Sequence, residues 1–565
     1  MGKYSLGLDY GTNSCRCVIV EISGGREIAS DVYDFPRGEQ GILLDPRDPN
    51  LARQHPRDYI DGTIAVVTNA IEIAIASDRT FDTGNIIGIG VDTTGSTPIP
   101  VDRDGTPLGL LPKFQDNLNA MAWLWKDHTS HDEAARITAV AATLRPHYLA
   151  KCGGTYSSEW FWAKLWHCLN VAPDVFTAAY SFVEHCDYIP ALLAGNAEPD
   201  KLVRGVCAAG HKAMYCEKWG GLPDKDFLSE LDPALADLRD RLYDHALTAD
   251  HPAGVLSDEW AQKLGLKPGI AIAVGAFDAH MGAVGSGIAD GTLVKILGTS
   301  TCDLLVKPSN ASLTDIPGVC GIVEGSVLPG YFGIEAGQSA VGDIFLWFVN
   351  HLVPDSYGTT QAEKFTNLSQ AAEAQNPGEH GLLALDWNNG NRCVLVDARL
   401  SGMILGQTLH TEAHEIYRCL VEATAFGALT IIGRLEEFGV TVNEVVTCGG
   451  LAGKNSMLMQ VYADVINRPM KIAMSDQTCA VGAAICGAVA AGTAGGGFET
   501  IEQAQQAICA LRDEVYEPVP KHHSVYAQLY SLYRDLHDAL GTGDWSGTLH
   551  HVMKELITIR EQQRG

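Results

Sequence analysis

Several signatures of common binding functions are absent from this chain of 565 residues. Its cysteines form no CxxC pair and no HExxH motif occurs, which excludes the most familiar zinc sites. No block of lysine and arginine offsets a formal charge of -28, so nucleic acid and acidic membranes are unfavourable partners. The longest run of small apolar residues, 479–493, is too short for a membrane span and predicts a closely packed helix.

The start of the chain also lacks the charged and apolar regions of a secretory signal, so we expect a cytoplasmic protein. Fifteen cysteines are scattered along the chain, several inside apolar runs, which predicts reduced and buried thiols. The composition, 46% hydrophobic and 19% charged, is typical of a soluble enzyme. The length favours roughly two to four domains.

Near its start the sequence contains a short apolar run that ends in a lone carboxylate and a donor-rich turn. Residues 6–15 read LGLDYGTNSC, in which Asp9 is followed by Gly11, Thr12 and Asn13. This pattern predicts a strand, a tight turn and a second strand. Because glycine allows close approach and hydroxyls add donors, the turn can wrap a phosphate while Asp9 holds a hydrated Mg²⁺. A plain hairpin with a solvated aspartate has the same pattern.

The elements that follow have the order of an α/β fold. Apolar residues at a spacing of three to four predict a helix over 56–78, and an apolar strand over 86–92 leads into a polar turn. Apolar strands over 270–274 and 292–297 repeat this order. Strands that alternate with helices favour a parallel sheet with ligands at the carboxyl ends of the strands.

The opening turn has a counterpart in the second half of the chain. The hexamer GTNSCR, residues 11–16, aligns with GTSTCD, residues 298–303, and apolar strands flank both. Short matches arise easily by chance, but these stand at the head of two similar halves. We therefore expect a duplicated α/β domain whose donor-rich turns, the second made by Gly298, Thr299 and Ser300, face each other across a cleft.

A second glycine turn follows a strand predicted over 442–447. Gly449 and Gly450 precede a helix predicted over 456–466, and such a turn admits a flat ligand or a ribose against the backbone. The residue after Lys454 is Asn455 instead of Ser or Thr, so the Walker pattern fails. The HRD and DFG strings of protein kinases are also absent where they would be needed.

Between about residues 105 and 260 the sequence is rich in aromatic residues. Five of the ten tryptophans lie between Trp123 and Trp166, together with Lys126 and Asp127. Aromatic rings cover the C–H faces of a sugar while polar groups fix its hydroxyls, so this segment can form a sugar pocket. A tryptophan-rich core beneath a long insertion has the same composition, and the residues alone leave both interpretations open.

Asp278 is the candidate for proton removal because it follows an apolar strand at the start of the second half, and therefore lies at the expected cleft. Phosphoryl transfer needs positioning, charge neutralisation and a carboxylate that accepts the proton of the acceptor hydroxyl. A base within hydrogen-bond reach contributes roughly 10²–10⁴-fold in rate. Aspartate is also a preferred N-cap, so a purely structural role at a helix start is the alternative.

Ten segments together resemble the FGGY carbohydrate kinase family, in the order of the family's motifs and over nearly the whole chain. They are LGLDYGTNS, GVDTTGSTPIPVD, LWKDH, YSSEWFWAKLWH, AGHKAMY, GAFDAHMGAVGSG, KILGTSTCD, GIEAGQSAVGD, LDWNNGNR and CGGLAGKNSMLMQVYADV. The resemblance implies two duplicated actin-like, ribonuclease H-like domains that close on ATP and a sugar. The implied domains are residues 1–283, with a sugar-binding insertion at about 105–260, and residues 284–565, with the nucleotide site and a helical tail.

The resemblance also implies roles for individual residues. Asp278 matches the family's general base, and Asp9 the acid on the metal side. The implied phosphate and nucleotide contacts are Gly11, Thr12, Asn13, Gly298, Thr299, Ser300, Gly342, Gly449, Gly450 and Asn455. The implied sugar contacts are Ser96, Lys212, Asp278 and Glu335, with Trp125, Lys126 and Asp127 lining the pocket.

The implied activity is transfer of a phosphoryl group from ATP, with Mg²⁺, to the terminal hydroxyl of a ketopentose. The implied sugar is L-ribulose, phosphorylated at its 5-hydroxyl. Xylulose and D-ribulose are the alternatives, since related kinases differ at the position of Lys126. A second interpretation is an actin-like ATP-binding module or scaffold without kinase activity, whose ATPase rate would not respond to sugar. The family resemblance also implies a homodimer, while the charge of -28 predicts no nucleic-acid or membrane partner.

Overall fold

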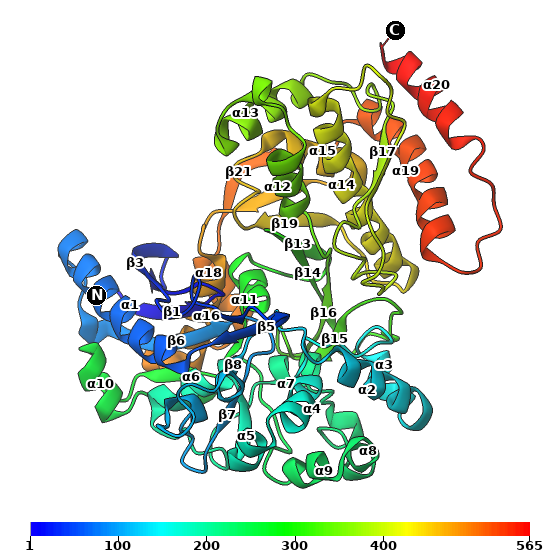
Figure 1. Ribbon diagram of the computed structural model, residues 1–565. Helices are drawn as coiled ribbons and strands as arrows, with labels where there is room; N and C mark the ends of the chain where they lie inside the picture. Colours follow the sequence, from blue (N-terminus) through cyan, green and yellow to red (C-terminus); the bar gives the residue numbers. More distant parts are fainter. Residues whose placement is uncertain (1, 565) are drawn as a thin grey trace.

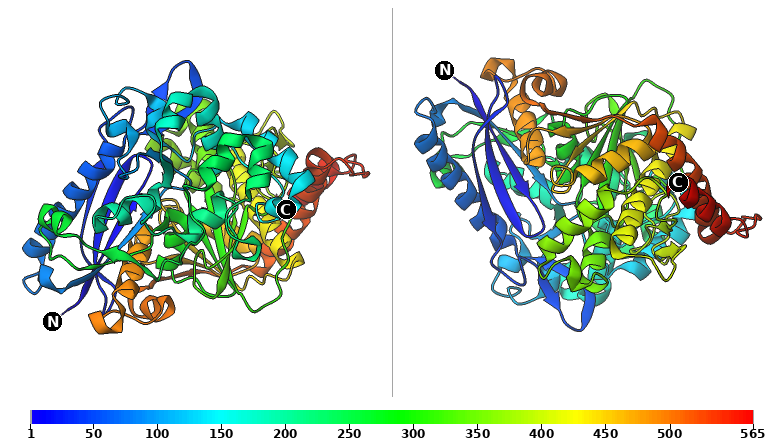
Figure 2. Two further views of the ribbon diagram at one scale, coloured as in Figure 1. Left: turned by 90° about the horizontal axis from the view of Figure 1, so that it is seen from below. Right: turned by 90° about the horizontal axis from the view of Figure 1, so that it is seen from above.

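The protein folds into two lobes, each built on a β-sheet, and the computed structural model describes residues 2–564. In Figure 1 the lower lobe, blue through green, carries the first sheet, and the upper lobe, green through red, carries the second. The first strand and the last two helices lie at opposite ends of the molecule in all three ribbon views (Figures 1 and 2).

The first sheet has seven strands in the order β10-β11-β6-β1-β2-β3, with β12 also paired to β6. The predicted opening hairpin and the strand over 86–92 are confirmed. Because β1 and β6 are parallel and in register, their carboxyl ends meet at one edge of the sheet. The strands are β1 (Tyr4–Tyr10), β2 (Ser14–Glu21), β3 (Arg26–Asp34), β6 (Ile86–Thr93), β10 (Pro252–Val255), β11 (Ala271–Ala273) and β12 (Ala276–Phe277).

The second sheet has the order β15-β16-β14-β13-β19-β20-β21 and repeats the core of the first. In both sheets the strand before the turn pairs antiparallel with the strand after it and parallel with a later strand. The predicted duplication is therefore confirmed. The strands are β13 (Thr292–Leu297), β14 (Thr301–Pro308), β15 (Gly321–Glu324), β16 (Tyr331–Ala336), β19 (Glu444–Cys448), β20 (Met470–Ala473) and β21 (Leu511–Tyr516).

The two turns differ in length, which the alignment of letters does not show. Tyr10 pairs with Cys15 across the first turn, whereas Leu297 pairs with Thr301 across the second. The second turn is thus one residue shorter, and Cys302 is the partner of Ile296 in the ladder. The equivalence of the outgoing strands in the aligned hexamers is therefore wrong by one residue.

Between β6 and β10 the chain forms a helical insertion with its own core. Trp123 and Trp162 are buried in that core, as the structural interpretation of the tryptophans expects. The helices of this core are α2 (His131–Leu144), α3 (Pro146–Ala150), α4 (Phe161–Val171), α5 (Pro173–Ala178), α7 (Val206–Lys212), α8 (Lys225–Leu231) and α9 (Pro233–Arg239), whereas α6 (His185–Ala194) and α10 (Asp258–Leu264) pack on the core of the first sheet. Two small sheets accompany the first lobe: β4 (Leu43–Asp45), β5 (Asp48–Gln54) and β8 (Ala122–Trp123), and β7 (Pro98–Val101) with β9 (Ser181–Glu184).

One helix of the second half packs on the sheet of the first. Helix α16 (Thr478–Ala490) contacts β1, β6 and α11 (Asp278–Gly285). A Cβ atom at Gly7 or Gly90 would lie 1.7 Å from a carbonyl oxygen of α16, so the close approach needs glycine. The helix predicted from the run 479–493 is thus confirmed and joins the lobes, and the expected boundary between residues 283 and 284 falls inside α11.

The remaining helices cover the two sheets and extend the second lobe. They are α1 (Pro56–Ser77), α12 (Gly342–His351), α13 (Gln361–Glu373), α14 (Ala413–Glu437), α15 (Ser456–Ile466), α17 (Gly492–Gly495), α18 (Ile501–Ile508), α19 (Pro520–Gly541) and α20 (Val552–Arg564), beside a small sheet of β17 (Leu383–Leu385) and β18 (Met403–Leu405). By length and composition alone, α1 and α14 are apolar enough to cross a membrane. In the fold α1 packs on β2 and β3, and α14 packs on α15 and β17.

Candidate active site

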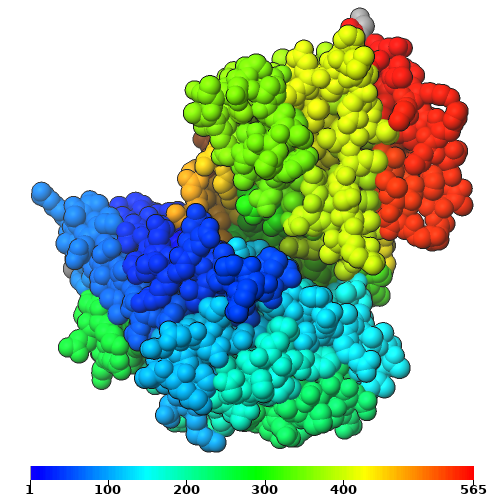
Figure 3. All heavy atoms as spheres, in the orientation of Figure 1, coloured from blue at the N-terminus to red at the C-terminus, as the bar shows by residue number. Residues whose placement is uncertain are grey.

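A cavity of about 300 Å³ lies between the lobes, beside the residues that follow β1, β6 and β13. The space-filling view shows a recess where the blue and cyan lobe meets the green and yellow lobe (Figure 3). The cavity brings the two predicted turns together, with Thr12 on one side and Gly298–Thr301 on the other. Its lining also includes Thr94, Gly95, Ser96, Trp125, Glu159, Trp160, Lys212, Asp278, His280, Glu335 and Arg392.

Three aspartates gather at the end of the first sheet next to this cavity. Asp9 and Asp92 are register partners at the ends of β1 and β6, and Asp278 follows β12, which pairs with β6. Arg16 Nε lies 3.2 Å from Asp9 Oδ2. Among the described residues, neither carboxylate oxygen of the buried Asp92 has a hydrogen-bond partner. The cluster therefore carries more carboxylates than the single neighbouring guanidinium neutralises.

The environment of Asp278 suits a general base. Burial raises the pKa of Asp278 to about 7, and the negative charge of Asp9 adds to the effect. Burial, Asp9 and Asp278 also raise the pKa of Asp92 well above its usual range. The N-cap of α11 is Phe277, and Asp278 is the first helical residue, so the N-cap interpretation of Asp278 is wrong. Its Oδ1 accepts a hydrogen bond from the N–H of Ala279 at 2.6 Å.

A buried ion pair forms the opposite wall of the cavity. Lys212, at the end of α7, lies with its Nζ 2.9 and 3.2 Å from the two carboxylate oxygens of Glu335 on β16. Burial alone would raise the pKa of Glu335, but the positive charge of Lys212 holds it below its usual range. His211 and His280 approach within 3.1 Å through their Nε2 atoms, and burial lowers the pKa of His280 to about 4. Both charges of the pair are therefore present at neutral pH beside uncharged imidazoles.

The two turns are held in different ways. Around the first turn, Gln54 donates to the backbone oxygen of Thr12 at 2.7 Å, and Asn13 donates to that of Gln40 at 2.6 Å. Trp125 Nε1 also donates to Thr12 Oγ1 at 3.0 Å. Each of these contacts involves a side chain, so side chains of the turn and of the neighbouring loops fix the first turn.

The second turn is held through its backbone. Thr299 O accepts the N–H groups of Val341 at 2.8 Å and Asp343 at 3.1 Å, and Gly298 O accepts that of Gly342 at 3.1 Å. Thr299 and Ser300 both line the cavity, and their hydroxyls have no hydrogen-bond partner among the described residues. They are free to donate to a ligand.

Ser96 is positioned by a buried network. Its Oγ donates to Glu184 Oε1 at 2.7 Å, and the other oxygen of Glu184 accepts the N–H of Thr97 at 2.7 Å. Lys164 donates to the backbone oxygen of Ser96 at 2.7 Å, and burial lowers the pKa of this lysine to about 8. Ser96 therefore reaches the cavity from a rigid turn.

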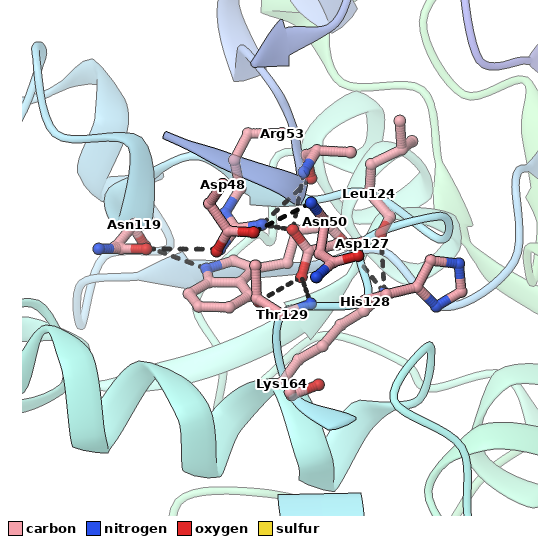
Figure 4. Close-up of polar contacts among 12 residues, drawn as sticks. Asp48, Asn50, Arg53, Asn119, Leu124, Asp127, His128, Thr129 and Lys164 are labelled. Atoms are coloured by element: carbon pink, nitrogen blue, oxygen red, sulfur yellow. Dashed lines mark hydrogen bonds and ion pairs between the residues drawn. The ribbon is translucent and has the colours of Figure 1, made fainter. Parts of the chain in front are cut away.

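The structure does not place Asp127 in the cavity. Its carboxylate is fully buried and forms an ion pair with Arg53, as Figure 4 shows. It also accepts the N–H of Ala52 at 2.8 Å and the hydroxyl of Thr129 at 2.6 Å. These bonds use both oxygens, so Asp127 anchors the loop that carries Trp125. Lys126 does not line the cavity either. Of the three residues predicted to line the pocket, Trp125, Lys126 and Asp127, only Trp125 does so.

Six of the ten predicted phosphate and nucleotide residues are outside the lining of this cavity, namely Gly11 and Asn13 of the first turn and four residues of the second half. Gly342 begins α12 behind the second turn, where a Cβ atom would lie 2.6 Å from Gly298 O. Gly449 and Gly450 follow β19 and are exposed. Asn455 is the N-cap of α15, accepts from Leu458 N at 3.0 Å, and donates to the Tyr417 hydroxyl at 3.2 Å. Its side chain is therefore already used by the fold, and the roles of these residues toward a nucleotide stay predictions.

Sequence reasoning missed several residues of the site. Trp160 and Glu159 belong to the quoted segment YSSEWFWAKLWH, His280 to GAFDAHMGAVGSG, and Arg392 to LDWNNGNR, and all four line the cavity. The quoted motifs therefore contained these residues, but the sequence did not show which residues of each motif line the cavity. Asp92 also ends a predicted strand before a polar turn, a position equal to that of Asp9.

Comparisons with known proteins agree with this geometry. Residues 4–285 match the N-terminal domain of the FGGY family of carbohydrate kinases, and residues 293–491 match its C-terminal domain. A curated "Ribulokinase" from Vibrio parahaemolyticus is 45% identical over 94% of this chain and 95% of its own, and one from Halalkalibacterium halodurans is 42% identical over 99% and 98%.

Solved structures share the fold at lower identity. A xylulose kinase from Rhodospirillum rubrum superposes with a TM-score of 0.77 at 22% identity, covering 95% of this chain and 99% of the other. A glycerol kinase from Plasmodium falciparum with ADP gives 0.74 at 15%, covering 95% and 98%. With two duplicated sheets, a shared cavity and family matches over both halves, this chain belongs to the FGGY family of carbohydrate kinases.

Proposed function

We propose that this protein transfers the terminal phosphoryl group of ATP to the 5-hydroxyl of L-ribulose, giving L-ribulose 5-phosphate for arabinose catabolism. The observation that carries the proposal is the convergence of Asp278, Lys212, Glu335 and the second turn in one cavity. The full-length similarity to two proteins named ribulokinase supports this choice of sugar.

In this proposal each group has a distinct role. Asp278, whose pKa is about 7, accepts the proton of the 5-hydroxyl while the hydroxyl oxygen attacks the terminal phosphorus of ATP. Thr299 and Ser300 donate to the phosphoryl oxygens, and this charge stabilisation is the main need of phosphoryl transfer. Asp278 is thus left protonated, and the proton returns to solvent after product release.

The sugar is oriented by the opposite wall. Lys212 donates to a sugar oxygen, and Glu335 accepts from hydroxyls, so the buried pair penalises analogues that lack those hydroxyls. Ser96 adds a contact from its rigid turn, and Trp125 and Trp160 offer ring faces. Closure of the lobes would exclude water, which otherwise accepts the phosphoryl group.

The acidic cluster fits a magnesium ion. Asp9 is the proposed ligand, and the unpartnered oxygens of Asp92 lie on the neighbouring strand, which is the hard oxygen environment that Mg²⁺ prefers. When bound, the ion would neutralise phosphate charge.

The proposed nucleotide contacts are the two turns, Gly342, and Gly449, Gly450 and Asn455 near the adenosine. A cytosolic location fits the fifteen free cysteines, and a homodimer stays a prediction.

A panel of pentuloses tests the proposal. The values of kcat/KM are compared for L-ribulose, D-ribulose and xylulose in an assay coupled to ADP release, with phosphorylated product identified by mass spectrometry. The expected result is the highest kcat/KM for L-ribulose. A clear preference for another pentulose would overturn the substrate, and an ATPase rate that ignores every sugar, with no sugar phosphate formed, would overturn the kinase activity itself.

A further inference from the structure

Two cysteines meet beside the candidate active site. Cys320 Sγ lies 3.1 Å from Cys393 Sγ, and no other two of the fifteen cysteines, all of which fall within residues 2–564, form a sulfur–sulfur hydrogen bond. Cys320 directly precedes β15 and is partly exposed, whereas Cys393, in the loop between β17 and β18, is buried. A disulfide has a sulfur–sulfur length of about 2.05 Å, so a movement of roughly 1 Å would close the bond.

Both cysteines adjoin residues of the cavity. Gly321, next to Cys320, is the register partner of Glu335. Arg392, next to Cys393, lines the cavity opposite the first lobe. A covalent bond between the two sulfurs would therefore pull together the strand that supports Glu335 and the loop that carries Arg392.

The surroundings prepare the more exposed thiol for reaction. The contact with Cys393 lowers the pKa of the Cys320 thiol against the effect of burial, and the charges of Arg392 and Lys212 act in the same direction as the contact. The same contact and burial raise the pKa of Cys393 well above its usual value. Oxidants attack thiolates that are accessible and beside positive charge, which describes Cys320 and not Cys393.

We propose that Cys320 and Cys393 form a reversible disulfide when the protein meets a peroxide, and that this bond lowers phosphorylation of the sugar in the adjacent cavity. The second half of the proposal rests on the proposed function, and the first half does not. Cytosolic disulfides are usually transient and regulatory, which fits a pair placed beside an active site.

The chemistry is a two-electron oxidation by hydrogen peroxide. The Cys320 thiolate attacks one peroxide oxygen, the O–O bond breaks, and the leaving hydroxide takes a proton to become water. The sulfur is then a sulfenic acid. The sulfur of Cys393 attacks that sulfur, the S–O bond breaks, and the leaving hydroxide takes the proton of the Cys393 thiol to become a second water as the S–S bond forms. A dithiol reductant reverses the change by thiol–disulfide exchange.

The closing experiment maps the bond in the full-length protein. Reduced protein is treated with hydrogen peroxide, free thiols are trapped, and peptides are identified by mass spectrometry. The expected product is a cross-linked Cys320–Cys393 peptide, lighter by two hydrogen atoms and cleaved by reductant. Cys320→Ser removes it, and Cys216→Ser, at another partly exposed cysteine with no sulfur partner, keeps it. Oxidation of Cys320 to sulfinic acid without a cross-link, or preferential cross-linking elsewhere, would overturn the pair.

The same samples report the effect on activity. Relative to its own reduced form, oxidised wild type should lose roughly tenfold to hundredfold in kcat/KM for sugar, the cost of a displacement near 1 Å in a site. Reductant should restore it, Cys216→Ser should behave like wild type, and Cys320→Ser should be insensitive to peroxide. A mapped disulfide with unchanged kcat/KM would refute the regulatory effect. A reduced protein that phosphorylates no pentulose would refute the proposed function, while the peptide map still decides the disulfide.

Discussion

The two turns of the duplicated sheets occupy equivalent places but carry different chemistry. In the first sheet, the paired strand ends before the turn are Asp9 and Asp92. In the second sheet, the paired residues at the same positions are Ile296 and Cys448. The incoming strands therefore correspond, yet both carboxylates of the first site are replaced by uncharged side chains in the second.

Because of this difference, the two lobes offer different chemical groups to a bound nucleotide. A second cluster of carboxylates would repel the phosphates of a nucleotide, whereas the hydroxyls and N–H groups of the second turn attract them without adding charge. In the proposed function, the first lobe supplies the proton acceptor and the metal-side acid. The two sheets thus share their geometry at the turns but differ in the charge that they place there.

The largest effect is expected from Asp278→Asn, which removes the proposed base and keeps its shape. kcat should fall by about 10²–10⁴-fold, because general base catalysis contributes on that scale. Initial rates with L-ribulose and ATP measure it. The matched control is Asp290→Asn, at an exposed carboxylate just beyond α11, which should keep wild-type rates. Near-normal turnover of the Asp278 variant would remove it from the mechanism.

Asp9→Asn tests whether the first turn's acid is needed. kcat should fall by about 10²–10³-fold, the usual cost of losing one group that stabilises charge in a transition state. The concentration of Mg²⁺ required for half-maximal rate should also rise. A variant with an unchanged metal requirement would show that Asp9 is a partner of Arg16 only.

Gly90→Ala tests the close contact that joins the lobes through the first sheet. The added Cβ would lie 1.7 Å from Ala483 O, so the free energy of unfolding should fall by about 1–3 kcal/mol, as for overpacked cores. Urea unfolding followed by circular dichroism measures it. Gly433→Ala, in α14 with no atom within 4 Å of the new Cβ, should instead raise stability by about 0.5–1 kcal/mol. Equal responses would contradict the packing argument.

Thr299→Val tests the neutral donors of the second turn. Loss of a hydroxyl that donates to a charged phosphate costs roughly 1.5 kcal/mol, or about tenfold in kcat/KM for ATP. Thr299→Ser keeps the hydroxyl and should stay close to wild type in the same assay. An unchanged kcat/KM for ATP in Thr299→Val, or a loss in Thr299→Ser as large as in Thr299→Val, would contradict the role of the hydroxyl as the donor.

The sequence predicted local structure well and tertiary pairing less well. The helix over 456–466 and the strands around both turns are confirmed, because apolar periodicity and turn residues act over short distances. The contact of α16 with the first sheet, and the pairing of Asp127 with Arg53, join residues far apart in the chain. No local pattern encodes such contacts. Motif identity located the site, but only the fold showed that Asp127 supports it while Trp160 and Arg392 line it.

In the proposed mechanism, burial and the negative charge of Asp9 raise the pKa of Asp278 and so adjust it for its role as the base. The most direct test of this mechanism is the pH dependence of the rate with both substrates far below saturation, which reports the free enzyme. Because the base must be ionised, the wild-type rate should fall as pH drops through about 7. In Asp9→Asn a nearby negative charge is gone, so the pKa of Asp278 should fall and this acid limb should move to lower pH. A limb that stays in place, or moves upward, would contradict the account.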